Sequence, residues 1–175
     1  MKIILVAVLS ADGKITAGNK IPVHEWASVE DRRYFSALIK KSRLVIMGRK
    51  TFDAARSVMT LSTTTLRVVL TRKPKTFARL AVPEQLEFTD ESPRALVKNL
   101  ERRGYKEALL VGGAKINTIF LQENLVDELW LTIEPVFLGR GKSLFAKTTP
   151  DIKLHLKSLR KLNTKGTLLL KYATH

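Results

Sequence analysis

The amino-acid sequence predicts an α/β fold with a mainly parallel central sheet and an antiparallel hairpin at the C-terminal end. Short, continuous apolar runs at residues 2–9, 44–47 and 108–111 are typical of strands that are buried on both faces. Segments with helical spacing separate these runs, as in a parallel sheet. Residues 154–162 and 167–172 instead alternate on either side of a polar turn, which indicates a closing hairpin.

Length and composition agree with one domain over residues 1–175. The chain is 45% hydrophobic, and single domains commonly have ~100–200 residues. There is no cysteine, which excludes disulfides, thiolate metal sites and a cysteine nucleophile, and we expect no metal site. No apolar run is long enough for a transmembrane helix, and the first run enters a turn in place of a cleavage site. We therefore expect a cytoplasmic protein without a membrane partner.

The charge balance is strongly positive. Lys and Arg number 31 and Asp and Glu number 16, which gives a net charge of +15. Such a charge suits nucleic acid, an anionic membrane or nucleotides. The basic residues are spread along the chain, and the aromatic residues, 7% of the total, do not interleave with them as a base-stacking surface requires. We therefore expect a solvated basic surface and a small anionic ligand, and no nucleic acid.

The first strand runs into a predicted loop at residues 16–23, and a long loop beside a buried strand is often a lid or a binding loop. Ser28 then caps a predicted helix at residues 29–40. Asp31 lies in the first turn of this helix and shares a face with Phe35, one turn later. Taken alone, Asp31 is either an exposed residue favoured by the helix dipole or a functional carboxylate.

The second apolar run ends in a turn that suits a phosphate. Gly48 stops the strand, and Arg49, Lys50 and Thr51 precede a short helix predicted at residues 52–56. Backbone N–H groups are unpaired where a strand turns into a helix. Two positive charges and a hydroxyl add donors for a phosphate there.

A second turn of this kind follows downstream. The third apolar run leads into Gly112–Gly113 and a predicted helix at residues 115–122, and paired glycines allow a ligand to approach the backbone closely. A further strand at residues 67–70 ends in Thr71 and Arg72. Because ligands of open α/β sheets bind at the carboxyl ends of the strands, these three strand ends together predict a nucleotide site.

The other elements follow from local rules. Ser92 caps a predicted helix that has Pro93 at its first position and ends at Gly104. The segment 128–137 is a predicted strand in which Pro135 indicates a bulge or an edge.

The order of these motifs resembles the dihydrofolate reductase superfamily over nearly the whole chain, and the spacing of Trp26, Asp31 and Phe35 matches that family. Segments 10–15, 125–128 and 135–141 look more like the riboflavin-pathway pyrimidine reductases on the same fold. The other residues that carry the resemblance are Ala7, Pro22, Ile46, Met47, Gly48, Arg49, Lys50, Thr51, Val111, Gly112, Gly113, Leu129, Trp130, Leu131 and Thr132.

The resemblance implies a three-layer dihydrofolate reductase-like fold, with helices on both faces of the sheet and NADPH as the cofactor. It implies that Arg72 and Lys115 meet the 2′-phosphate, that the Gly112–Gly113 peptide is cis, and that the Ala7 backbone touches the nicotinamide. The cofactor-binding residues that it implies are Ala7, Gly48, Arg49, Lys50, Thr51, Leu70, Thr71, Arg72, Val111, Gly112, Gly113, Ala114, Lys115 and Ile116.

The resemblance also implies a substrate site around Asp31, which would bind a pterin ring with Thr132 hydrogen-bonded beside it. An apolar pocket lined by Leu5, Phe35 and Trp26 is expected to raise the pKa of Asp31 and to suit it to support protonation of the substrate. The predicted catalytic residues are Asp31, Thr132 and Trp26, and the predicted substrate-binding residues are Leu5, Asp31, Phe35 and Thr132.

The main functional prediction is an NADPH-dependent reductase that converts dihydrofolate to tetrahydrofolate. Two departures weaken it. The arginine that clamps the folate glutamate in that family has no clear counterpart at residues 56–67, and Asn117 replaces a tyrosine that is common near the nicotinamide.

The alternative is a riboflavin-pathway pyrimidine reductase that acts on 5-amino-6-(5-phosphoribosylamino)uracil or its diamino-pyrimidinone analogue. In that case Lys14 or Arg140 would meet the substrate phosphate. A non-enzymatic, basic nucleic-acid-binding module is a third and minor alternative. The sequence leaves open whether the protein is a monomer or a homodimer.

Overall fold

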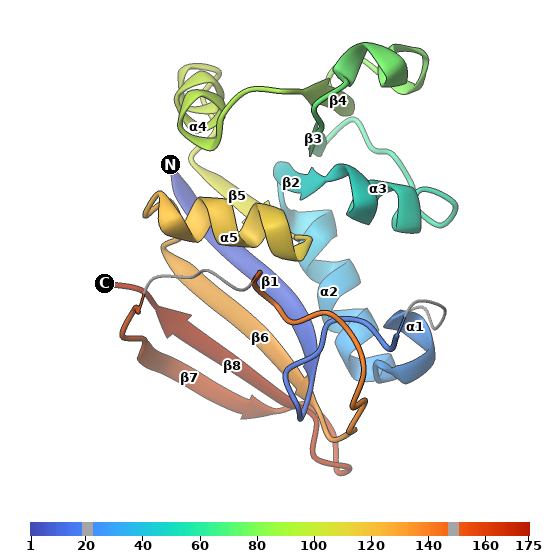
Figure 1. Cartoon of the computed structure of the whole chain (residues 1–175), viewed down its shortest axis with the longest axis vertical. Coiled ribbons are helices and arrows are strands. Elements are labelled where there is room, and N and C mark those ends of the chain that lie inside the picture. Colours follow the sequence, from blue (N-terminus) through green and yellow to red (C-terminus); the bar gives the residue numbers. More distant parts are fainter. Residues whose placement is uncertain (19–22, 147–150) are drawn as a thin grey trace.

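The computed structural model describes residues 1–18, 23–146 and 151–175. The strands form one eight-stranded sheet in the order β4-β3-β2-β5-β1-β6-β8-β7 (Figure 1). The strands are Lys2–Ser10 (β1), Leu44–Gly48 (β2), Leu66–Leu70 (β3), Leu86–Thr89 (β4), Glu107–Leu110 (β5), Glu128–Glu134 (β6), His155–Lys161 (β7) and Leu168–Ala173 (β8). The helices are Val23–Trp26 (α1), Val29–Lys41 (α2), Arg49–Ala55 (α3), Pro93–Arg102 (α4) and Ala114–Gln122 (α5), with a 3-10 helix at Pro74–Leu80 (η1).

The topology confirms the predicted mixed sheet. Neighbouring strands from β4 to β6 are all parallel, whereas β8 is antiparallel to both β6 and β7. The strand β1 lies between β5 and β6, with Leu5 opposite Leu110 on one side and Leu129 on the other. The carboxyl ends of β1, β2, β5 and β6 therefore meet along one edge of the sheet, where ligands of such folds bind.

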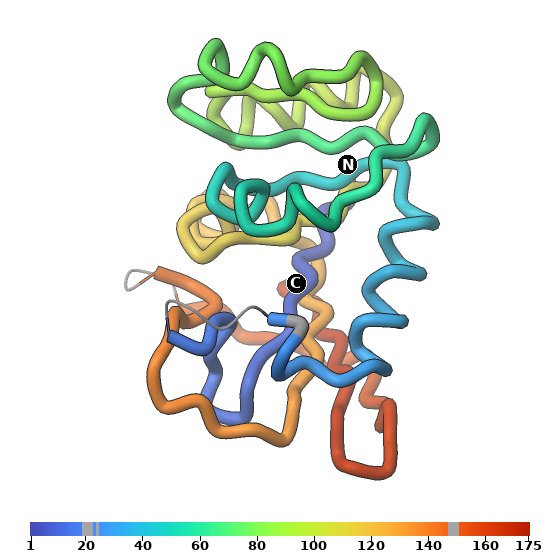
Figure 2. The backbone as a smooth tube through the Cα atoms, turned by 90° about the vertical axis from the view of Figure 1, so that its right-hand side faces the viewer, coloured from blue at the N-terminus to red at the C-terminus, as the bar shows by residue number. Residues whose placement is uncertain are grey.

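Helices cover both faces of the sheet, as predicted. One core cluster joins β-strand residues to α4 and α5, through side chains that include Leu100 and Phe120. The other joins the opposite face to α2 and α3, through Leu38, Ile39 and Phe52. Figure 2 shows α2 in light blue and α5 in gold on opposite sides of the sheet, which gives three layers.

Local capping explains where the two longer helices begin. The Ser28 hydroxyl accepts a hydrogen bond of 3.1 Å from the Asp31 N–H at the start of α2. The Ser92 hydroxyl does the same for Ala95 in α4, where Pro93 occupies the first helical position. Both caps agree with the predictions from the sequence.

Several boundaries differ from the predictions. The helix α3 starts at Arg49, three residues earlier than predicted, because Gly48 is its extended N-cap. The strand β6 ends at Glu134, since Pro135 cannot donate to a sheet ladder. The predicted loop at residues 16–23 gives way to α1 at Val23; its residues 19–22, Pro22 among them, lie outside the described part. No helix in the described ranges is long and apolar enough to cross a membrane.

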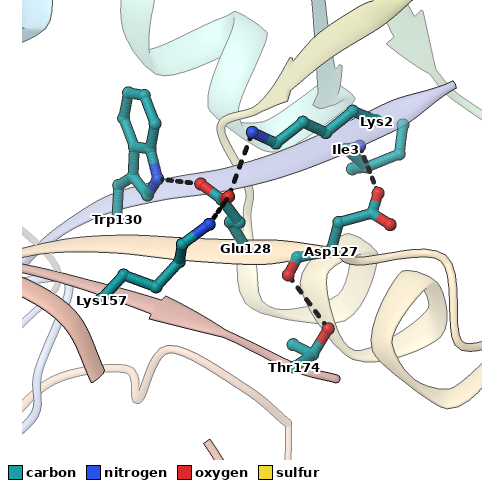
Figure 3. Close-up of polar contacts among 7 residues, drawn as sticks. All are labelled: Lys2, Ile3, Asp127, Glu128, Trp130, Lys157 and Thr174. Atoms are coloured by element: carbon teal, nitrogen blue, oxygen red, sulfur yellow. Dashed lines mark hydrogen bonds and ion pairs between the residues drawn. The ribbon is translucent and has the colours of Figure 1, made fainter. Parts of the chain in front are cut away.

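At the amino ends of β1 and β6, Glu128 is the centre of a polar network (Figure 3). It is 7% exposed and accepts hydrogen bonds from Lys157 Nζ at 2.9 Å and Trp130 Nε1 at 2.7 Å, while Lys2 Nζ lies 3.1 Å away. Burial raises the pKa of Glu128, but these contacts outweigh burial and lower the pKa to about 2. The network ties β1, β6 and β7 together at the end of the sheet opposite the candidate site.

Candidate active site

The two strand–glycine–helix turns lie against each other. The Gly48 N–H at the end of β2 donates a 2.7 Å hydrogen bond to the carbonyl of Gly112 after β5. A Cβ atom on Gly48 would lie 2.7 Å from Cγ1 of Ile116, and one on Gly113 would lie 3.3 Å from Oγ1 of Thr51. This close approach requires glycine at position 48. The Gly112–Gly113 peptide is cis, as the resemblance implies.

Basic side chains surround this junction. Arg49 and Lys50 begin α3, Lys115 lies in the first turn of α5, and Arg72 follows β3; all four are exposed. The Arg49 guanidinium is paired with the carboxylate of Asp53, one turn along α3. Backbone N–H groups at a helix start, together with arginine and lysine, have the chemistry that binds phosphates. The junction therefore fits the pyrophosphate and the 2′-phosphate of a dinucleotide.

The other predicted cofactor residues lie near the same strand ends. Leu70 is the last residue of β3 and Ala114 the first of α5, and Ala7 belongs to the central strand β1, opposite Leu131 of β6. Thr71 and Val111 directly follow β3 and β5. The structure thus brings this predicted set to one edge of the sheet.

Asp31 and Thr132 form the second part of the site. Asp31 is 7% exposed in the first turn of α2, and Thr132 is 2% exposed on β6. Burial raises the pKa of the Asp31 carboxyl; hydrogen bonding by Thr132 lowers it in part, and the negative charge of Glu134 raises it further. The predicted direction of the pKa shift is therefore confirmed, and the Asp31 carboxyl is suited to carry a proton.

Aromatic residues accompany Asp31 on α1 and α2. The indole N–H of Trp26 and the hydroxyl of Tyr34 are buried and have no hydrogen-bond partner among the described residues. Burial raises the pKa of Tyr34 to about 12. Phe35, on the same helix face as Asp31, is 36% exposed and is available to a ligand. The negative charge of Asp31 also raises the pKa of Tyr34, so the Tyr34 hydroxyl belongs to the surroundings of the Asp31 carboxyl.

The position of Leu5 differs from the expectation. Its side chain is fully buried in the core cluster that includes α4 and α5, whereas α2 packs on the cluster that contains its neighbours Ile4 and Val6. Successive side chains of a strand point to opposite faces, so the Leu5 side chain faces away from α2. It does not line the Asp31 pocket.

Sequence reasoning missed Glu134, a second buried carboxylate near Asp31. Glu134 is 3% exposed and accepts hydrogen bonds of 2.8 Å from the Ser28 N–H and from the Thr167 hydroxyl. The alternation along β6 contained a clue, because Thr132 and Glu134 are two residues apart and therefore lie on one face of the strand.

A third carboxylate, Asp12, received no role in the sequence analysis, although its segment is a predicted turn and carries part of the resemblance to the pyrimidine reductases. It accepts hydrogen bonds from the N–H groups of Leu138 (3.0 Å) and Gly139 (2.9 Å) and from the Ser10 hydroxyl (2.6 Å). These bonds lower its pKa. Asp12 thereby joins the loop after β1 to the loop after β6, and Figure 2 shows these blue and orange segments side by side.

Asn117 connects the segment after β6 to α5, close to the junction of Gly48 and Gly112. It is 1% exposed, and its amide Nδ2 donates a 3.0 Å hydrogen bond to the carbonyl of Leu144. The next residue, Thr118, accepts a 2.8 Å hydrogen bond from the N–H of Ala146. The residue that departs from the dihydrofolate reductase pattern thus anchors the segment after β6 onto α5.

Comparison with known proteins gives a consistent result. A relative from Caenorhabditis elegans, named as a putative dihydrofolate reductase, is 28% identical over 171 residues, which cover 90% of this chain and 78% of the relative. The crystal structure of a putative riboflavin biosynthesis protein from Shewanella sp. PV-4 has a TM-score of 0.81 and 21% identity, and the match covers 100% of this chain and 99% of that chain.

A crystal structure from Thermotoga maritima, of a diaminohydroxyphosphoribosylaminopyrimidine deaminase/5-amino-6-(5-phosphoribosylamino)uracil reductase, has a TM-score of 0.77 and 18% identity. The match covers 99% of this chain and 56% of that longer chain. At such identities the two structures establish the shared fold. The family described as the RibD C-terminal domain matches residues 1–168, nearly the whole chain, and this protein therefore belongs to the RibD C-terminal domain family.

Proposed function

We propose that this protein is an NADPH-dependent reductase that acts on a phosphorylated aminopyrimidine, 5-amino-6-(5-phosphoribosylamino)uracil or its diamino-pyrimidinone analogue. The observation that carries the proposal is the match of residues 1–168 to the RibD C-terminal domain family, in a chain whose two strand–glycine–helix turns meet at the carboxyl edge of the sheet. The reductase named in the Thermotoga maritima structure shares this fold and supports the choice of substrate.

The residues at the junction fit NADPH. Arg49 and Lys50 would hold phosphate oxygens, and Arg72 and Lys115 supply charges for the 2′-phosphate. The absence of side chains at Gly48 and Gly113 lets the two turns pack closely together, against Ile116 and Thr51, so that their backbone N–H groups lie side by side at the strand ends. NADPH, when bound, supplies the hydride, while the protein supplies binding, orientation and electrostatics.

Asp31 is the proposed proton donor. Reduction at the ribose carbon that carries the amino-pyrimidine opens the sugar ring to a ribityl chain, and the ring oxygen must then gain a proton. A buried carboxyl with a raised pKa holds a proton at a pH at which an exposed aspartate has lost it. Thr132 orients this carboxyl from β6. The basic residues Lys14 and Arg140 are proposed to meet the phosphate of the substrate.

Dihydrofolate is the second candidate substrate. The Asp31 and Thr132 pair favours it, because a carboxylate beside a hydroxyl suits the amino and ring N–H groups of a pterin. The name of the Caenorhabditis elegans relative points the same way. Against it, Asn117 is used to anchor the Leu144 segment, where the dihydrofolate reductase pattern has a tyrosine.

The test is NADPH consumption with each substrate offered separately to the wild type and to Asp31→Asn. We expect turnover of the phosphoribosylamino-pyrimidine, lost in the variant, and little turnover of dihydrofolate. Methotrexate-sensitive turnover of dihydrofolate would replace the first proposal with the second. Failure to bind NADPH would refute both.

A further inference from the structure

Glu134 lies at the centre of a second buried network, close to Asp31. Its Oε1 accepts the 2.8 Å hydrogen bond from the Ser28 N–H, and its Oε2 accepts the 2.8 Å bond from the Thr167 hydroxyl. Both donors are neutral. An ionised carboxylate with only neutral donors keeps its negative charge in the pocket, and that charge acts on its neighbours.

Ser28 links Glu134 directly to the backbone of Asp31. The Ser28 N–H is held by Glu134 while its hydroxyl accepts the 3.1 Å hydrogen bond from the Asp31 N–H. The N-terminus of α2 is thus attached to the end of β6, the strand that also carries Thr132. Loss of this attachment would free the turn that orients the Asp31 carboxyl.

The C-terminal hairpin holds the same turn from another side. Thr167, the residue before β8, accepts a 2.9 Å hydrogen bond from Nδ2 of Asn163, and the same nitrogen donates a 3.1 Å hydrogen bond to Oε2 of Glu30. Glu30 is the residue before Asp31. The carboxylates of Glu30 and Glu134 are therefore both bonded to the hairpin turn, through Asn163 and Thr167, so a segment more than 130 residues away is attached to the start of α2.

We infer that Glu134 is a positioning residue for the reduction: through Ser28 it holds the turn that carries Asp31 beside Thr132. The negative charge of Glu134 acts in the same direction, because it disfavours ionisation of the Asp31 carboxyl. This inference rests on the proposed role of Asp31 as proton donor. Because both Glu134 oxygens accept hydrogen bonds from within the protein, from Ser28 and Thr167, we assign Glu134 a positioning role.

The charged groups that act on Asp31 come from two elements. Glu134 of β6 raises the pKa of Asp31, and Arg32, next to it on α2, lowers it. Arg160 of β7 faces the ring of Tyr34, at 6.0 Å, and lowers the pKa of that tyrosine. Glu134 is therefore the acidic neighbour whose removal should change the titration of Asp31 most directly.

The test compares Glu134→Gln with Glu128→Gln. Both replace a buried carboxylate on the same face of β6 by an amide of the same size, six residues apart, but only Glu134 lies beside Asp31. In Glu134→Gln the amide can still accept from Ser28 and donate to Thr167, so the charge is removed while the contacts remain. We expect the fall of kcat/KM with rising pH to move to lower pH in Glu134→Gln and to stay in place in Glu128→Gln.

A second pair of variants tests whether this network positions the turn at the start of α2. Thr167→Val removes the hydroxyl that donates a hydrogen bond to Glu134. We expect kcat to fall roughly tenfold and KM for NADPH to stay unchanged, because a displaced Asp31 carboxyl lowers the rate of the reaction more than the affinity for the cofactor. Thr167→Ser keeps the hydroxyl and should restore kcat. An unmoved pH profile in Glu134→Gln, or equal losses in Thr167→Val and Thr167→Ser, would overturn the inference.

Carbon-13 NMR titration of the Asp31 carboxyl separates this inference from the proposed function, since it needs no turnover. A titration of Asp31 that moves to lower pH in Glu134→Gln supports the coupling even in a protein that reduces neither substrate. An active wild type whose Asp31 titration is the same in Glu134→Gln would refute the coupling and leave the reductase standing.

Discussion

Asp31 occupies a place where a carboxylate is unfavourable for folding. Its pKa is raised in the folded chain, mainly by burial, so the folded state binds this proton more tightly than the unfolded state. The stability that the protonated Asp31 carboxyl contributes is fully present below the ordinary pKa of aspartate. It is lost as the pH rises through the raised pKa that Asp31 has in the folded chain. A group that is kept at this cost is a candidate for function.

This reasoning gives the first prediction, for Asp31→Asn. Turnover should fall by about 10²- to 10⁴-fold, the range usual for loss of a general acid. The free energy of unfolding at neutral pH should be equal to or greater than that of the wild type, because the amide cannot ionise in the buried site as the carboxyl can. NADPH affinity, measured by fluorescence titration, should stay the same. A variant with wild-type turnover would remove Asp31 from the mechanism.

Arg49 supports a second prediction at the same scale. Its guanidinium already lies against the Asp53 carboxylate at the start of α3, so it is held near the cofactor junction. Arg49→Ala should weaken NADPH binding by roughly ten- to a hundredfold, since a charge-assisted hydrogen bond is worth about 1.5–3 kcal/mol and about 1.4 kcal/mol is a factor of ten. NADH should be affected less.

The matched control for Arg49 is Arg56→Ala, at the other end of the same helix. It removes one positive charge from α3 without touching the strand ends and should leave both affinities nearly unchanged. Equal losses for NADPH and NADH in Arg49→Ala would argue against a contact with the 2′-phosphate.

At the scale of secondary-structure elements, the contact between β2 and α5 depends on Gly48. A methyl group there would overlap Ile116 Cγ1, which lies 2.7 Å from the position of the added Cβ. We expect Gly48→Ala to destabilise the fold by about 1–3 kcal/mol, the usual cost of overpacking, and to weaken NADPH binding by moving the first turn of α5.

The double variant Gly48→Ala/Ile116→Ala provides the check on this contact. It removes the clashing atom and should recover part of the NADPH affinity lost in Gly48→Ala, measured by the same titration. Additive losses in the double variant would show that the two residues do not interact.

Glu128 gives a pH-dependent prediction for the junction of β1, β6 and β7 (Figure 3). Its folded pKa of about 2 lies below the ordinary value of 4.5, so the folded state binds this proton less tightly. The corresponding stability is present above pH 4.5 and is lost as the pH falls toward 2. The shift corresponds to at most ~3 kcal/mol.

Glu128→Gln should therefore be less stable than the wild type at neutral pH by roughly 1–3 kcal/mol. The difference should shrink as the pH is lowered through the titration range of Glu128, as measured by urea unfolding at a series of pH values. A difference that does not change with pH would mean that packing, and not charge, is responsible.

The sequence predicted elements well where local rules decide. The caps at Ser28 and Ser92 and the glycine at the end of β2 are each determined by neighbours within a few residues, and all three were identified. The polar networks were not. Glu134 meets Ser28 across 106 residues and Asp12 meets Leu138 across 126 residues, and a single sequence contains no periodicity that reveals such pairs.

At the scale of the whole molecule, the C-terminal edge of the sheet is unusual. Every residue of β7 is exposed, and Leu154, Leu156 and Leu159 are 41%, 56% and 57% exposed. Lysines and an irregularity between Leu156 and Ser158 interrupt this edge. Such features keep an edge strand from pairing with other chains. The sequence predicted the hairpin itself, but not that every residue of its first strand would be exposed.

The net charge of +15 affects the whole molecule, because electrostatic forces act over longer distances than packing or hydrogen bonds. Ion pairs among the described residues include five of the 31 basic side chains, those of Lys2, Arg49, Arg94, Arg103 and Lys157, and Lys and Arg outnumber Asp and Glu by 31 to 16 in the whole chain. The unbalanced positive charges repel one another in the compact state and attract anions from a distance. Salt screens both effects beyond about 10 Å at moderate ionic strength.

Added salt should therefore have opposite effects on the stability of the protein and on the rate at which NADPH binds. Added sodium chloride should raise Tm, because screening weakens the repulsion among lysines and arginines of the folded chain. The same salt should lower the association rate of NADPH, because screening removes the attraction that guides an anionic ligand to the junction of β2 and β5. Differential scanning calorimetry and stopped-flow fluorescence measure the two quantities in the same buffers. An association rate that does not change with salt would show that the excess positive charge does not attract NADPH from a distance. The basic residues at the strand ends would then act on the cofactor only through direct contacts.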